Sequence, residues 1–60
     1  MKVFVNEIEI DLIPGMTVRH ALIHVDLLKE IEKGKRVFDQ WGNELGLDGA
    51  VVENVKIYLE

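Results

Sequence analysis

The chain has 60 residues and no cysteine, so we expect one domain over residues 1–60 whose small core is supported by no disulfide and no thiolate-ligated metal. Its net charge is −4, from seven Lys and Arg against eleven Asp and Glu, which disfavours nucleic acid as a partner. No apolar run approaches the roughly 20 residues of a membrane span and no signal peptide is recognisable, so we expect a cytoplasmic protein with no membrane partner.

The first two predicted elements are strands that form a hairpin. In residues 1–5 and in residues 8–12, apolar side chains recur at every second position, which is the period of a half-buried strand. Only two residues separate them, and a connection of that length joins antiparallel neighbours. The Pro-Gly pair at 14–15 then ends the second strand, because proline donates no ladder hydrogen bond and glycine tolerates turn geometry.

The next segment predicts one helix from Thr17 to Lys33. Thr17 is the expected N-cap, and Gly34 is placed to be a left-handed C-cap. Between them, apolar residues recur at the three-and-four spacing of a single buried stripe. The stripe comprises Val18, Ala21, Leu22, Val25, Leu28 and Ile31.

The remaining chain predicts a strand at 36–39, a turn, a short strand at 44–45 and a final strand at 55–59. This order indicates an α+β fold, in which one helix packs across one face of a mixed sheet of four to five strands. The expected core lies between the sheet and that helix. It consists of Val3, Val5, Ile10, Leu12, Leu22, Val25, Leu28, Val37, Ile57 and Leu59.

Three segments carry a resemblance to a known superfamily: residues 1–6, which open the hairpin, residues 14–22, which enter the helix, and residues 47–52, which precede the final strand. On these segments the chain resembles the ubiquitin-like β-grasp superfamily, and within it the thiamine and molybdopterin sulfur carriers. The resemblance implies a β-grasp fold. Those carriers act through a C-terminal Gly-Gly, whereas this sequence ends in Leu59-Glu60, so we expect no conjugating tail.

Two other functions stay open at this stage. One is a sulfur carrier for thiamine or molybdopterin synthesis whose Gly-Gly tail is lost or missing here, as it would be if the natural chain continued past Glu60. The second is an RNA-associated domain, because residues 23–27 resemble part of the TGS domain signature. The acidity of the chain counts against the RNA-associated alternative.

We expect no catalytic residue, and therefore no enzyme. The chain contains neither serine nor cysteine, which removes the usual side-chain nucleophiles. Glu7, Glu9, Asp11 and Asp39 could supply paired carboxylates, but a general acid needs burial in a cleft to raise its pKa. These four side chains are expected on a solvated face of the small sheet.

We also expect no metal and no cofactor. His20 and His24 lie four residues apart, a spacing that puts two imidazoles on one helix face, and Asp26 or Glu30 could complete a zinc site. The glutamate that normally follows the first histidine of a catalytic zinc motif is replaced by Ala21. No glycine-rich phosphate loop is present either.

Four aromatic residues are the predicted partner-binding site. If the residues next to each aromatic residue in its own strand point toward the helix, then Phe4, Phe38 and Tyr58 project from the opposite face of the sheet. Trp41 lies in the neighbouring turn. Aromatic side chains anchor many protein interfaces, although cross-strand pairing within the sheet also favours them. The sequence thus predicts a non-enzymatic interaction module that binds a protein partner, or itself, through its outer sheet face.

Overall fold

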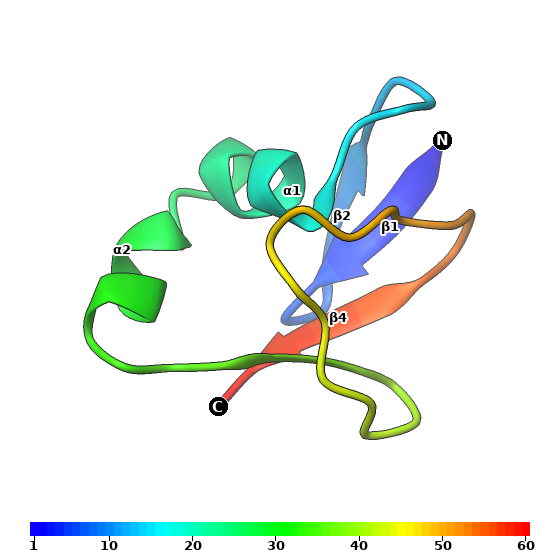
Figure 1. Ribbon diagram of the computed structural model, residues 1–60. Helices are drawn as coiled ribbons and strands as arrows, with labels where there is room; N and C mark the ends of the chain where they lie inside the picture. Colours follow the sequence, from blue (N-terminus) through cyan, green and yellow to red (C-terminus); the bar gives the residue numbers. More distant parts are fainter.

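The computed structural model describes residues 1–60 as an α+β fold with one mixed four-stranded sheet and two short helices on the same side of it (Figure 1). The spatial order of the strands is β2-β1-β4-β3. The central pair, β1 and β4, is parallel, and both outer pairs are antiparallel. The elements are β1 (Lys2–Val5), β2 (Ile8–Asp11), α1 (Val18–His24), α2 (Leu28–Glu32), β3 (Val37–Asp39) and β4 (Lys56–Leu59).

The predicted hairpin of the first two strands is confirmed. Val5 of β1 lies opposite Ile8 of β2, which leaves Asn6 and Glu7 as a two-residue turn. Both turn residues have positive φ angles, of 48° and 71°. Two successive positive φ angles define the tight turn whose twist matches that of the strands on either side.

The prediction of one helix from Thr17 to Lys33 is wrong, because the chain leaves the helical path at Asp26, where φ is 58°. The Leu27 N–H donates to the Leu22 carbonyl at 2.8 Å and the Asp26 N–H donates to the Ile23 carbonyl at 3.1 Å. These two bonds form a Schellman motif, which ends α1 with aspartate in the position that glycine usually takes. Aspartate tolerates this left-handed conformation because its short polar side chain costs less there than most others.

The predicted C-cap at Gly34 is confirmed at the end of α2. Gly34 has a φ of 100° and donates its N–H to the Ile31 carbonyl at 3.0 Å. Lys35 donates to the Glu30 carbonyl at 3.2 Å, which completes a second Schellman motif. The two helices therefore end in the same way, eight residues apart in sequence.

The start of α1 is fixed by a segment distant in sequence. Thr17 is the N-cap, as predicted, and its N–H donates to His20 Nδ1 at 3.0 Å. The next two backbone N–H groups, of Val18 and Arg19, donate to the carbonyls of Gly49 and Leu47 at 3.0 and 2.9 Å. Since these donors have no partner inside the helix, the loop before β4 satisfies them. This contact anchors α1 to that loop.

Ten buried hydrophobic residues form the core between the sheet and the helices. Seven of the ten predicted core residues are among them. Val25, Leu28 and Leu59 are only half-buried, because each lies at or near the end of a short element, but all three pack against the core. The short strand expected at 44–45 makes only an isolated bridge to Phe38, so the sheet has four strands. The buried residues are Val3, Val5, Ile10, Leu12, Val18, Ala21, Leu22, Val37, Val55 and Ile57.

Candidate protein-interaction surface

The outer sheet face, opposite the helices, carries a row of three aromatic side chains. Val5 and Ile57 lie side by side and are fully buried toward the helices, so their neighbours in β1 and β4 point the other way. Phe4 of β1 is placed beside Lys56 of β4, and Tyr58 of β4 lies opposite Phe38 of β3. Phe4, Tyr58 and Phe38 therefore cross three adjacent strands, and we call them the aromatic row. All three are half-buried.

An open hollow of about 440 Å³ lies within this face. It is lined by Phe4 and Tyr58 from the aromatic row and by the charged residues Glu7 and Lys56. Neither charged side chain forms an ion pair within the chain. The hollow thus combines apolar walls with one free negative and one free positive charge.

Trp41 lies apart from the hollow, at the turn that follows β3, and its side chain is 74% exposed. The carboxylate of Asp39 holds this turn: its Oδ1 accepts hydrogen bonds from the N–H groups of Trp41 and Asn43, both at 2.9 Å. Gly42 adopts a φ of 85° and donates to the Asp39 carbonyl at 3.1 Å. The indole is therefore presented by a hydrogen-bonded turn, beside the aromatic row in sequence but outside the hollow.

The pKa of Asp39 is lowered by this turn. Partial desolvation acts to raise the pKa, but the hydrogen bonds from the N–H groups of Asn43 and Trp41 and from the Asn43 side chain outweigh it. A lowered pKa stabilises the folded turn above the ordinary aspartate pKa, and this contribution is lost as the pH falls through the lowered value. A general acid needs a shift in the opposite direction.

We expect acid to loosen the turn around Trp41 before the sheet unfolds. The fluorescence of Trp41, the only tryptophan, should change as the pH falls below the ordinary aspartate pKa, while far-ultraviolet circular dichroism stays constant. Asp39→Asn removes the ionisable group and should abolish that change. An emission spectrum that follows the circular dichroism through the whole titration would show that the turn and the sheet respond together.

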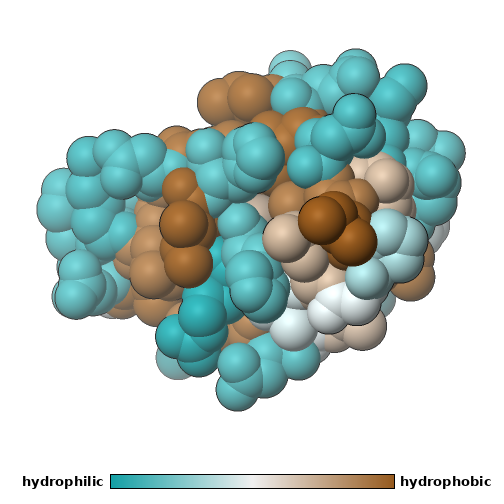
Figure 2. Space-filling model, turned by 90° about the horizontal axis from the view of Figure 1, so that it is seen from above, coloured by the Kyte–Doolittle hydropathy of each residue, from teal (hydrophilic) through white to brown (hydrophobic).

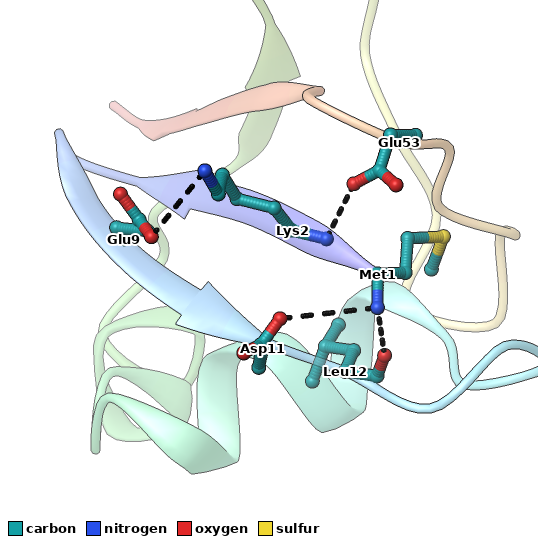
Figure 3. A network of polar contacts seen from close by, with 6 residues as sticks. All are labelled: Met1, Lys2, Glu9, Asp11, Leu12 and Glu53. Carbon is teal, nitrogen blue, oxygen red and sulfur yellow. Dashed lines mark hydrogen bonds and ion pairs between the residues drawn. The ribbon is translucent and has the colours of Figure 1, made fainter.

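Two of the other candidate carboxylates, Glu9 and Asp11, belong to an exposed polar network on β1 and β2 (Figure 3). Glu9 lies 3.7 Å from the Lys2 ammonium, and Asp11 lies 3.9 Å from the amino group of Met1, which donates to the Leu12 carbonyl at 2.8 Å. The side chain of Asp11 is 92% exposed. Exposed ion pairs of this length contribute little to stability. Because Glu9 is paired with Phe4 and Asp11 with Lys2, these side chains lie on the solvated outer face of the sheet.

The structure does not bring the two histidines into a metal site. His20 Nδ1 is occupied by the Thr17 N–H, and no group of three or more His, Asp or Glu residues could hold a metal ion. The two acidic candidates are each paired with a lysine: Glu30 lies 3.1 Å from the Lys33 ammonium and Asp26 lies 3.4 Å from that of Lys29. The hydrogen bond and the charge of Lys33 lower the pKa of Glu30. No helix has the length and apolar character needed to cross a membrane.

Apolar surface also occurs outside the outer sheet face, but as separate areas. Figure 2 shows brown apolar areas interrupted by hydrophilic side chains. Single exposed apolar residues are normal on folded proteins. The aromatic row differs from them because the strand register pairs Phe38 with Tyr58, and Tyr58 and Phe4 line the same hollow. The large hydrophobic residues that are most exposed are Ile8, Ile13, Ile23, Trp41 and Val52.

Sequence reasoning missed Glu7 and Lys56 as members of the site. The two-residue period of β4 puts Lys56 on the same face as Tyr58, so a signal for it was present. Glu7 lies in a turn, where the period of the strands no longer indicates a direction. Comparison of the chain with models of protein families, with curated proteins and with solved structures finds no match in any of the three.

Proposed function

We propose that this chain is a ubiquitin-like β-grasp domain that binds another protein through its outer sheet face and has no enzymatic activity of its own. Support for the fold comes from the topology: a hairpin, a helical crossover and a last strand parallel to the first give the order β2-β1-β4-β3. The segments that resemble the sulfur carriers are the hairpin, the entry to α1 and the loop that caps it.

The aromatic row is the observation that carries the proposal. Three aromatic side chains on adjacent strands offer rigid apolar area, and aromatic residues contribute strongly to the energetics of protein interfaces. Burying that area yields about 25 cal/mol for each Å² removed from water, from which the ordering of both partners must be subtracted. Trp41, at the turn after β3, is a further exposed aromatic residue that we propose as part of the binding site.

Replacing Phe4 and Tyr58 together with serine tests the proposal. Because these side chains face away from the helices, the double variant should keep its cooperative melt while its capture of partner protein falls by about tenfold or more. The measurement is quantitative affinity capture from a lysate of the source cells, beside a thermal melt followed by circular dichroism. Val52→Ser, which changes a residue that is 61% exposed outside the row, is the matched control.

Two outcomes would contradict the proposal. Equal capture by the double variant and the natural sequence would show that the outer face is not the binding surface. Loss of the cooperative melt would show that Phe4 and Tyr58 belong to the stabilising core, in which case their role is cross-strand packing.

A further inference from the structure

We propose that the partner that covers the hollow is a second copy of this chain, held across a two-fold axis by reciprocal ion pairs between Glu7 and Lys56. The inference rests on the function proposed above, because it uses the same face. It goes further by naming the partner and the contacts that select it.

The four residues that line the hollow lie at the corners of a quadrilateral. Phe4 is beside Lys56 at one level of the β1–β4 pair. One level further along, the end of β1 lies beside Tyr58: the Asn6 N–H donates to the Ile57 carbonyl at 2.8 Å, and Asn6 Oδ1 accepts from the Leu59 N–H at 3.3 Å. Glu7 follows directly in the turn. The two aromatic residues therefore occupy one diagonal and the two charged residues the other.

A two-fold axis along the aromatic diagonal makes this surface complementary to itself. When two copies face each other across such an axis, residues on the axis meet their own counterparts and residues on either side exchange places. Phe4 then meets Phe4 of the second copy, and Tyr58 meets Tyr58 of the second copy. Glu7 of each copy meets Lys56 of the other. One surface thus provides apolar contact at its centre and two ion pairs at its flanks.

The charge distribution of the chain favours this partner. Five of the seven basic side chains form ion pairs within the chain, and of the two that do not, Lys56 is the one in the aromatic surroundings of the hollow. Glu7 at the opposite corner is also unpaired. A partner whose surface carried charges of one sign only would leave either Glu7 or Lys56 facing a like charge or no charge. A second copy supplies an opposite charge to each of them.

The size of the chain favours it too. The core has ten buried residues and the chain has no cysteine, so neither a large core nor a disulfide stabilises the fold. Chains of this size often gain the missing burial by oligomerisation. A stable interface removes about 800 Å² from each partner, about a fifth of the 3926 Å² surface of this chain. Self-association through the outer face would add that burial in every molecule.

Charge reversal tests the ion pairs directly. Glu7→Lys alone and Lys56→Glu alone each replace two attractive contacts with two repulsive ones, so each should raise the dimer dissociation constant about tenfold or more in sedimentation equilibrium at low salt. An equimolar mixture of the two variants should form a heterodimer, because each chain supplies the charge that the other lacks. Its dissociation constant should return to within about threefold of the original value. High salt should reduce all of these differences.

The matched controls are Glu32→Lys and Lys35→Glu, which change the same charges at exposed positions outside the hollow and outside any ion pair. They should leave dimerisation unchanged. A chain that stays monomeric at millimolar concentration, or two variants that fail to form a heterodimer, would overturn this inference. If capture of a different protein then still depended on Phe4 and Tyr58, the proposed function would survive; if it did not, both proposals would fail.

Discussion

Replacing Leu22 with alanine should lower the free energy of unfolding by about 2–5 kcal/mol, the range for emptying a fully buried leucine site. Leu22 is completely buried, and it is among the largest buried side chains of the core. A folded protein gains about 0.05–0.15 kcal/mol per residue, so a chain of 60 residues has about 3–9 kcal/mol in total. The variant should therefore lose a large part of its stability, and a urea titration followed by circular dichroism measures the loss.

Ile23→Ala is the matched control for Leu22→Ala. Ile23 is the next residue of α1 and is 54% exposed, so truncating it removes little buried surface. Its effect should stay within about 0.5 kcal/mol, as for most surface substitutions. Equal effects of the two variants would show that α1 does not pack on the sheet through Leu22.

The strands could be predicted from the sequence because their alternation is short-range information. Once Val3 and Val5 point inward, the pleat fixes the direction of Phe4, and the same argument holds for Tyr58 next to Ile57. The turn at Pro14-Gly15 was equally readable: Gly15 has a φ of 100°, and the Met16 N–H donates to the Ile13 carbonyl at 3.1 Å. Local chemistry determines each of these features.

The break between α1 and α2 could not be read from the apolar spacing. Val25 and Leu28 both keep to the predicted stripe and both pack against the core, although Asp26 between them is left-handed. Two helices separated by only three residues can continue the same apolar face, so the apolar spacing does not reveal the interruption. The available signals were the weak helix propensity of Val25 and Asp26 and the match between Leu22 and Leu27 as the apolar pair of a Schellman motif.

The candidate site was predictable in its aromatic part and not in its charged part. Phe4, Phe38 and Tyr58 follow from strand alternation and lie where it places them. The position of Glu7 relative to Lys56 depends on how β1 and β4 are paired, which joins segments about fifty residues apart in sequence. No local pattern contains that register. It had to come from the tertiary structure.

Substitutions at Asp26 distinguish the broken helix from a continuous one by the sign of their effects. Glycine adopts positive φ freely, whereas alanine at a φ of 58° is strained. We therefore expect Asp26→Gly to unfold at higher urea concentration than Asp26→Ala, with a difference of about 1–2 kcal/mol in the free energy of unfolding. A continuous helix predicts the reverse order, because alanine exceeds glycine by about 1 kcal/mol in a helix interior.

The comparison of these two variants isolates the effect of backbone conformation on the free energy of unfolding. Both substitutions remove the exposed ion pair of Asp26 with Lys29, at 3.4 Å, so its contribution cancels. Ile23, inside α1 and exposed, supplies the control: there alanine should be more stable than glycine by the helix-interior difference of about 1 kcal/mol. Opposite orders at positions 23 and 26 would establish that the helix ends between them. The same order at both positions would restore the single helix that the apolar spacing predicts, and with it a longer and stiffer support for the sheet that carries the aromatic row.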